Sequence, residues 1–376
     1  MEKDNPLKIL VTGANGFIGR NLCVFLKEKG YFVRGGVRNN MRDVSGVDEY
    51  IQVGDINELT DWQQALAGVD TVIHLAARVH IMKDPVANPL ELFRKVNVFG
   101  TERLARMAAK AGVKRFIFIS SVKVNGEGFR DCFAPPLAGL AMTQRVAGLA
   151  LTQMEAGLAL TTGAYTEKDA PAPQDAYGIS KMEAEQVLVS IAANTGFKTV
   201  ILRLPLVYGP GVKANFKSLI KIAGAGLPLP FKGINNRRSF LYIGNLVDAI
   251  FTCIAHPQAA GETFLVSDGQ DVSTPDLIKM IASAMNKKAV LFSLHPGILK
   301  ALCKIVGKNE ELEKLTGSLL VDSSKIRNLL GWKVPFTMEE GVKETVRVVA
   351  FSHNKRGYLK LDKKGKIEYP FIEGQE

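Results

Sequence analysis

The stretch Val11-Thr12-Gly13-Ala14-Asn15-Gly16-Phe17-Ile18-Gly19 lies between an apolar run and a helical pattern. Gly13 permits a tight turn, Gly16 lets the backbone approach a pyrophosphate, and Gly19 lets the helix pack closely on the strand. The N-terminus of that helix would present free N–H groups and its positive dipole end to the phosphates. The stretch therefore predicts a dinucleotide-binding strand–turn–helix unit.

Apolar strand patterns alternate with helical patterns through the first half of the chain. Strands are predicted at 8–11, 32–37, 50–53, 71–75, 115–120 and 199–204, and helices at 20–29, 62–66, 91–111 and 180–194. Continuous apolar strands separated by helices indicate a parallel sheet covered on both faces. The predicted fold class is α/β, a Rossmann-like doubly wound parallel sheet followed by a smaller mixed α/β substrate lobe.

The composition changes along the chain, and three regions are predicted from it. Residues 1–205 are expected to form the dinucleotide-binding domain, residues 206–350 the substrate lobe, and residues 351–376 a polar, basic tail. Within the second region, helices are predicted at 243–255, 274–285, 322–330 and 338–350, with a short strand at 263–266. Glycine and proline recur between these elements, which is typical of a mixed lobe.

A nine-residue unit that begins Ala-Gly-Leu-Ala occurs three times within residues 134–163, from Ala138, Ala147 and Ala156. Nine residues make about two and a half helical turns, so successive apolar faces would point in opposite directions. We interpret the repeats as a duplicated insertion tolerated at a surface loop. The alternative is a lid or contact surface over the active site, because long loops are often functional.

The composition restricts the compartment and the partners. Four cysteines lie far apart, at Cys23, Cys132, Cys253 and Cys303, which argues against a zinc site or a disulfide framework and suits a reducing cytosol. We expect a cytoplasmic protein with no signal peptide, transmembrane segment or metal. The net charge is +11, but no helix-turn-helix or RNA-binding signature accompanies it, so no nucleic-acid partner is predicted.

Part of this positive charge lies in the second half of the chain, where we predict a diphosphate-binding role for it. The basic side chains there are Lys213, Lys217, Lys221, Lys232, Arg237 and Arg238.

A second motif, Tyr177-Gly178-Ile179-Ser180-Lys181, predicts the chemistry. Tyr177 and Lys181 are four residues apart and share one face of a helix. A neighbouring ammonium favours the phenolate, so we expect it to lower the pKa of Tyr177. Ser121 ends a predicted strand and can hydrogen-bond a substrate oxygen. Together they supply a general acid/base, its tuning cation and an orienting donor for hydride transfer beside a nicotinamide.

The end of the second strand bears on the choice of cofactor. An NAD enzyme usually has an acidic residue there for the ribose 2′-hydroxyl, whereas this chain has Arg38, with Arg34 nearby. A guanidinium suits a 2′-phosphate, so we predict NAD(P)(H) with NADP(H) favoured. Asp55 could reach the adenine, and His74 is interpreted as a packed core histidine. The expected cofactor-binding residues are Gly13, Gly16, Phe17, Ile18, Gly19, Arg38, Asp55, Ile56, Ala76, Tyr177 and Lys181.

The two motifs together resemble the extended short-chain dehydrogenase/reductase superfamily, in its nucleotide-sugar epimerase/dehydratase/reductase group, over roughly residues 7–349. Further similar stretches are Val96-Asn97-Val98-Phe99-Gly100-Thr101, Tyr208-Gly209-Pro210-Gly211, Arg237-Arg238-Ser239-Phe240 and Asn245-Leu246-Val247-Asp248. The resemblance implies that Arg238 contacts a nucleotide diphosphate, that Asn215-Phe216 contact the base, and that Lys123 and Lys217 add to the substrate site. A homodimer is the habit of this group.

Three stretches are similar to bacterial UDP-4-keto-6-deoxy-N-acetylhexosamine reductases of polysaccharide synthesis, the enzymes that form UDP-QuiNAc. They are residues 120–127, 172–177 and 211–216. The resemblance implies reduction of the 4-keto group of a UDP-6-deoxy-N-acetylhexosamine for O-antigen or capsule precursors. Sugar dehydratases have Asp-Glu where this chain has Val122-Lys123, which disfavours dehydration. Epimerases usually have Asn where this chain has Leu206.

Two alternatives stay open. One is a UDP-sugar 4-epimerase, of the UDP-glucose or UDP-N-acetylglucosamine type, which returns its hydride to the substrate. The other is a non-catalytic NADP-sensing binding protein, although such a protein has no need for Ser121, Tyr177 and Lys181 together.

Overall fold

The computed structural model describes residues 6–39, 44–79, 88–127, 163–294, 297–298, 304, 309–351, 360–361 and 367–368. The nine-residue repeats and most of the predicted tail lie outside these residues. Within the described ranges, every helix is too short or too polar to cross a bilayer.

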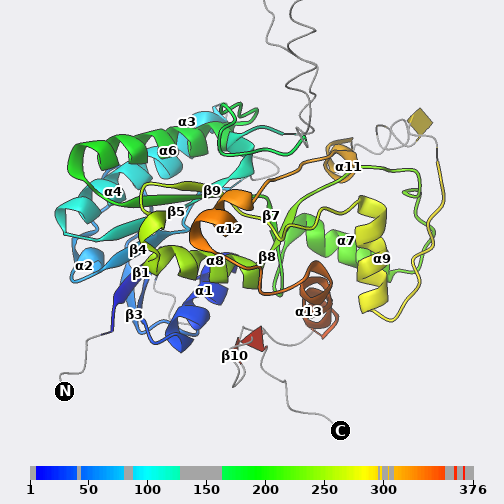
Figure 1. The fold of residues 1–376 in the computed structure, drawn as a ribbon, viewed down its shortest axis with the longest axis horizontal. Coiled ribbons are helices and arrows are strands. Elements are labelled where there is room, and N and C mark those ends of the chain that lie inside the picture. Colours follow the sequence, from blue (N-terminus) through cyan, green and yellow to red (C-terminus); the bar gives the residue numbers. More distant parts are fainter. Residues whose placement is uncertain are drawn as a thin grey trace, which may run out of the picture.

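A seven-stranded parallel sheet forms the larger lobe (Figure 1), with the order β3-β2-β1-β4-β5-β6-β9. The strands are β1 (Lys8–Thr12), β2 (Phe32–Val37), β3 (Glu49–Gln52), β4 (Thr71–His74), β5 (Arg115–Ser121), β6 (Thr199–Leu204) and β9 (Thr263–Leu265). The doubly wound fold predicted from the sequence is confirmed. The strand order reverses between β1 and β4, where dinucleotides bind in such sheets.

Helices cover both faces of this sheet. Ile9 and Val11 of β1 pack into one hydrophobic cluster and Leu10 into another, because successive strand residues face opposite layers. The first layer holds α1 (Phe17–Glu28) and α8 (Ile243–Ala255). The second holds α2 (Gln63–Leu66), α3 (Pro89–Arg94), the π-helix η1 (Lys95–Phe99), α4 (Gly100–Lys110) and α6 (Ala176–Thr195). The π-turn inside the predicted helix 91–111 was not expected.

The smaller lobe lies beside the ends of the strands (Figure 1). It comprises β7 (Leu206–Tyr208) paired with β8 (Phe240–Tyr242), and the helices α7 (Ala214–Gly224), α9 (Thr274–Ala284), α11 (Asn309–Thr316) and α13 (Met338–Phe351). Short elements are η2 (Val122–Val124), η3 (Pro257–Ala259), β10 (Lys360–Leu361) and β11 (Ile367–Glu368). The sequence placed α8, β9 and α12 (Ser324–Leu330) in this lobe, but they pack on the large sheet, because β9 pairs with β6 and α12 lies against β9.

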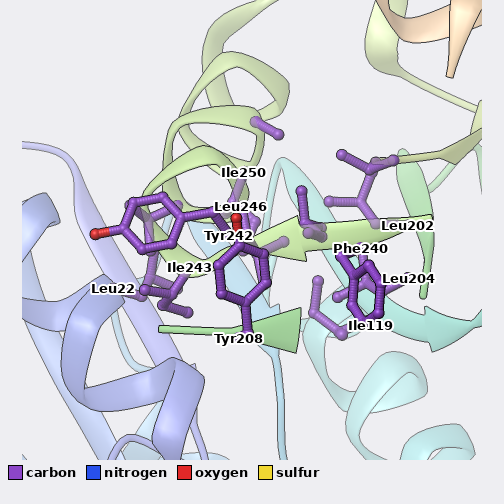
Figure 2. Close-up of a cluster of buried hydrophobic side chains, with 14 of the residues drawn as sticks. Leu22, Ile119, Leu202, Leu204, Tyr208, Phe240, Tyr242, Ile243, Leu246 and Ile250 are labelled. Atoms are coloured by element: carbon purple, nitrogen blue, oxygen red, sulfur yellow. The ribbon is translucent and has the colours of Figure 1, made fainter. Parts of the chain in front are cut away.

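A continuous apolar core joins the two lobes. Figure 2 shows Tyr208, Phe240 and Tyr242 of the small sheet gathered with Leu202 and Leu204 of β6. All five side chains are at least nine-tenths buried. The smaller lobe is thus fixed to the strand ends by packing, and the site between them has a rigid frame.

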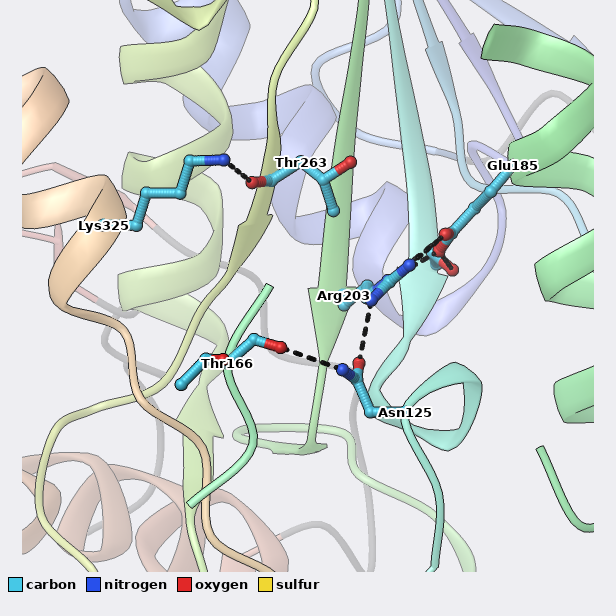
Figure 3. Close-up of polar contacts among 7 residues, drawn as sticks. Asn125, Thr166, Glu185, Arg203, Thr263 and Lys325 are labelled. Atoms are coloured by element: carbon cyan, nitrogen blue, oxygen red, sulfur yellow. Dashed lines mark hydrogen bonds and ion pairs between the residues drawn. The ribbon is translucent and has the colours of Figure 1, made fainter. Parts of the chain in front are cut away.

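A buried polar network ties α6 to β5 and β6 (Figure 3). The Arg203 guanidinium on β6 pairs with the Glu185 carboxylate on α6 at 2.6 Å and donates to the Asn125 amide oxygen at 3.1 Å. The Asn125 amide donates to the Thr166 carbonyl, and the Ser120 hydroxyl donates to Glu185 at 2.5 Å. Each buried charge therefore has both an ionic partner and further hydrogen bonds, which lone buried charges need.

We predict that Glu185→Ala lowers the free energy of unfolding by about 3–5 kcal/mol, because it leaves the Arg203 guanidinium buried without its carboxylate. Glu183→Ala on the same helix is the matched control. Its partner Arg94 is about one-third exposed, so this loss should lower the free energy of unfolding much less. Urea unfolding of both variants measures the difference. Equal losses of unfolding free energy in the two variants would show that the buried pair stabilises the protein no more than the exposed pair.

Candidate active site

The glycine turn has the geometry that a pyrophosphate requires. Gly13 has φ +69°, and a Cβ there would come within 3.0 Å of the Ala76 backbone nitrogen. A Cβ on Gly19 would approach the Gly13 carbonyl to 2.3 Å, so α1 packs directly on the turn. Gly16 caps α1 without a side-chain hydrogen bond. The first-turn amides of Phe17 and Ile18 are therefore available to an anion, as at other helix N-termini.

His74 lies beneath this turn and is structural. Its Nδ1 is 2.7 Å from the Thr12 hydroxyl and its Nε2 is 3.0 Å from the Thr101 hydroxyl. Burial, with a smaller effect of the Lys181 charge, lowers the pKa of His74 to about 3, so the ring stays neutral at physiological pH. The interpretation as a packed core histidine is confirmed. The Thr12 hydroxyl also accepts from the Ala76 amide, which fixes the backbone after β4.

Asn97 is a positioning residue that the sequence analysis did not single out. It lies in the π-helix η1, where its amide exchanges hydrogen bonds with the Arg78 backbone at 2.8 and 3.0 Å. The same amide donates to the Ser180 hydroxyl, which donates to the Tyr177 carbonyl. Asn97 thus links the loop after β4 to the start of α6. An amide inside an otherwise apolar helical run was the available signal.

Tyr177 and Lys181 lie on one face of α6, as predicted. The Lys181 ammonium is 5.9 Å from the centre of the Tyr177 ring and 4.4 Å from that of Phe118, and it donates to the Ile119 carbonyl at 2.8 Å. Burial lowers the pKa of Lys181 to about 7, opposed by the Glu185 charge. Burial, followed by the Asp175 charge, raises the pKa of Tyr177. The expected lowering is wrong here, because desolvation outweighs any help from Lys181.

Ser121 ends β5, as predicted, and its hydroxyl accepts from the Lys123 amide at 3.3 Å. The Lys123 ammonium lies between two carboxylates, 2.7 Å from Glu127 and 2.6 Å from Asp175. Asp175 also caps α6 by accepting from the Gly178 amide at 2.6 Å. The ion pairs therefore connect the Ser121 turn to the helix end that bears Tyr177, and Lys123 already has anionic partners.

The predicted catalytic residues and the glycine turn belong to one region of the structure. Gly13 touches Ala76, and the His74 ring stacks on Phe118 at a centroid distance of 5.9 Å. Phe118 in turn lies under the Lys181 ammonium, on the strand that Ser121 ends. These contacts connect the turn after β1 with the end of β5 and the face of α6. Such an arrangement is suited to redox chemistry next to a dinucleotide.

The expected adenosine-binding residues are arranged differently from the prediction. Arg38 and Asp55, both exposed, pair with each other at 3.0 Å. Arg34 is only 5% exposed and points away from the cofactor edge. Its guanidinium pairs with Glu49 at 2.8 Å and donates to carbonyls of the α2 segment at 2.8–3.2 Å. Arg34 is thus engaged in structural contacts, whereas the exposed Arg38 follows the end of β2, where the prediction put it. Ile56 lies half-buried against Gly100.

In the smaller lobe, the residues predicted to bind the substrate differ in their burial and contacts. Arg238 is partly buried and donates to the Gly317 carbonyl at 3.3 Å, and burial lowers its pKa. Lys217 is exposed on α7, and Asn215 lies in the first turn of the same helix, although its side chain lies outside the described set. Phe216 is 3% exposed and stacks on Tyr208 at 5.0 Å. Its ring is part of the core, so the predicted contact of this residue with a base would have to be made by its backbone.

Residues 9–267 match the NAD dependent epimerase/dehydratase family. A UDP-glucose 4-epimerase from Vibrio cholerae is 42% identical over 356 residues, 94% of this chain and 99% of that protein. An N-acetyl-alpha-D-glucosaminyl-diphospho-ditrans,octacis-undecaprenol 4-epimerase from Escherichia coli O157:H7 is 27% identical, covering 93% of this chain and 96% of that protein. UDP-glucuronic acid 4-epimerase from Bacillus cereus, solved with NAD, superposes with a TM-score of 0.66 at 24% identity, covering 92% and 99%. This last likeness concerns the fold.

Proposed function

This chain belongs to the NAD dependent epimerase/dehydratase family, and we propose that it transfers hydride at carbon 4 of a UDP-linked sugar. The observation that carries the proposal is the grouping of Ser121, Tyr177 and Lys181 around the strand end next to the glycine turn. A bound nicotinamide dinucleotide supplies or takes up the hydride. The glycine cradle, which side chains at Gly13 and Gly19 would fill, fits such a group.

In this proposal the protein's own groups manage the proton and the oxygen. Tyr177 exchanges a proton with the sugar oxygen as the carbon is reduced or oxidised. Ser121 orients that oxygen by a hydrogen bond. Lys181 supports the phenol and holds the cofactor ribose, and its partly lost charge is restored by any anion that approaches it.

We propose net reduction of the 4-keto group of a UDP-6-deoxy-N-acetylhexosamine as the reaction. The raised pKa of Tyr177 supports it, because a phenol that stays protonated is suited to donate its proton to a nascent alkoxide. Leu206 also supports it: its side chain is 37% exposed just beyond β6 and has no amide for the diphosphate contact of epimerases.

The second candidate is 4-epimerisation of a UDP-sugar. The name of the Vibrio cholerae relative favours it, since that protein is 42% identical over nearly the whole chain. The name of the Escherichia coli relative extends the candidates to sugars carried on undecaprenyl diphosphate. Epimerisation regenerates its cofactor, whereas reduction consumes it, so one assay separates the two.

We predict that the protein oxidises NADPH or NADH stoichiometrically when given UDP-4-keto-6-deoxy-N-acetylglucosamine. The assay follows the absorbance of the reduced cofactor. UDP-glucose, UDP-N-acetylglucosamine and the undecaprenyl-diphosphate sugar are tested without reduced cofactor. Tyr177→Phe should slow turnover about 10²–10⁴-fold at unchanged dinucleotide affinity, because the proton donor is lost. Tyr31→Phe, at a tyrosine packed on Phe251, is the control.

Interconversion of a UDP-hexose without consumption of cofactor would contradict the proposed reduction and support 4-epimerisation. Full activity of Tyr177→Phe in either assay would contradict the proposed site itself.

We propose NADP(H) as the preferred cofactor, with Arg38 as the residue that selects it. Arg38 is 70% exposed and its ion pair with Asp55 is a surface contact, so the guanidinium can leave it at little cost. Arg38→Ala should weaken NADPH binding about tenfold or more, since charge-assisted hydrogen bonds are lost, with NADH nearly unchanged. Arg106→Ala, at an exposed helix arginine, is the control. Equal effects on both cofactors in titrations would contradict this role.

We also propose a homodimer through the outer face of η1 and α6. Phe99 is 42% exposed and lines a surface hollow there with Val98 and Val187. Light scattering should give the mass of two chains, and Phe99→Asp should reduce it to one. A wild-type mass of one chain would contradict the dimer. A cytoplasmic location remains a prediction.

A further inference from the structure

Exposed apolar side chains concentrate on the outer edge of the smaller lobe. Of the eleven large apolar side chains that are exposed in the described residues, five fall between residues 222 and 298. They are Ile222, Leu227, Val290, Phe292 and Ile298, with exposed fractions of 41, 64, 50, 43 and 52%. Single exposed apolar residues are normal, but a group of them marks an interaction site.

Backbone pairing brings most of this group together. The Leu229 amide donates to the Val290 carbonyl at 2.9 Å, and the Phe292 amide donates to the Leu229 carbonyl at 3.0 Å. The stretch after α7 therefore lies against the stretch after α9. Figure 1 shows the second stretch running along the edge of the smaller lobe that faces away from the large sheet. We call the side chains of Ile222, Leu227, Lys287, Lys288, Val290 and Phe292 the outer patch.

The charge of this region has one sign. Residues 212–240 and 277–308 contain twelve lysines and arginines and no aspartate or glutamate. These twelve exceed the net charge of the whole chain, +11, so the remainder of the protein is nearly neutral. Lys287 and Lys288 are exposed within the patch, and the Lys287 ammonium donates to the Gly224 carbonyl at the end of α7. Two of the twelve have carboxylate partners, Lys279 with Asp276 and Arg237 with Asp271, and both pairs lie outside the outer patch.

We propose that the outer patch docks the protein reversibly onto an anionic lipid bilayer. Lysines next to exposed Leu, Val and Phe match both layers of such a surface, the anionic headgroups and the apolar tails below them. Lysine charges or exposed apolar side chains by themselves do not hold a protein on a membrane, whereas the two together do. A diphosphate substrate needs the cations of this lobe but not the exposed apolar side chains. The proposal is independent of the reaction assigned above.

Flotation of the full chain with vesicles tests the proposal. Vesicles of phosphatidylcholine are compared with vesicles that also contain phosphatidylglycerol. Wild type should float with the anionic vesicles, less at high salt, and should stay behind with phosphatidylcholine alone. Lys287→Glu/Lys288→Glu and, separately, Leu227→Ser/Phe292→Ser should each lower the partition coefficient at least about tenfold.

Matched variants on the larger lobe serve as controls. Lys110→Glu/Lys198→Glu makes the same change in net charge at exposed lysines, and Leu59→Ser removes a leucine that is 80% exposed. Both should stay within about twofold of wild type in flotation, because only the outer patch contacts the lipid. All variants should melt at similar temperatures and keep their turnover in solution. Phe292→Ser alone replaces the double variant if the latter fails to fold.

Three results would overturn the proposal. Wild type that does not float with anionic vesicles has no membrane affinity. Equal losses in the patch and control variants would mean that net charge alone attracts the lipid. If wild type does not float and the Leu227→Ser/Phe292→Ser variant has a lower molar mass in solution than wild type, the outer patch contacts a second copy of the chain and not a membrane.

Discussion

The buried ion pair between Arg203 and Glu185 is the interaction on which the arrangement of the site depends. It crosses from β6 to α6 at 2.6 Å, and the Ser120 hydroxyl of β5 completes it. Ser120 is followed by Ser121, and Glu185 lies one helical turn after Lys181, which lies one turn after Tyr177. The strand and the helix that carry the chemistry, β5 and α6, are therefore held to β6 by one satisfied cluster of charges. Lone buried charges would be costly, so the cluster has one stable arrangement.

The same burial sets the protonation of the site. Burial lowers the pKa of Lys181, which is 2% exposed, and raises the pKa of the partly buried Tyr177, with the Asp175 charge acting in the same direction. A neutral His74 fills the space between the glycine turn and Phe118 without adding a charge. Phe118 and the neutral His74 thus lie next to the two titratable groups of the site. This is the environment in which small changes in nearby charge produce large shifts in pKa.

Much of this arrangement was predictable from the sequence because it follows from local rules. The strands and helices of the larger lobe follow from apolar periodicity, and Ser121 ends its strand as expected. The contacts that a side chain makes with partners distant in the sequence were not predictable. Arg34 turns toward the carbonyls of the α2 segment, and Phe216 enters the aromatic core. Spacing alone gives no information on such contacts. The return of α8 and β9 to the large sheet depends equally on long-range pairing.

The central claim is that the phenol of Tyr177, the ammonium of Lys181 and the hydroxyl of Ser121 surround a nicotinamide whose pyrophosphate lies on the Gly13–Gly19 turn. A crystal structure of the protein with NADP(H) and UDP tests this directly. The account predicts the pyrophosphate at the N-terminus of α1 and the nicotinamide ring within contact of Tyr177 and Ser121. A dinucleotide bound elsewhere, or a ring separated from Tyr177 by other side chains, would contradict it.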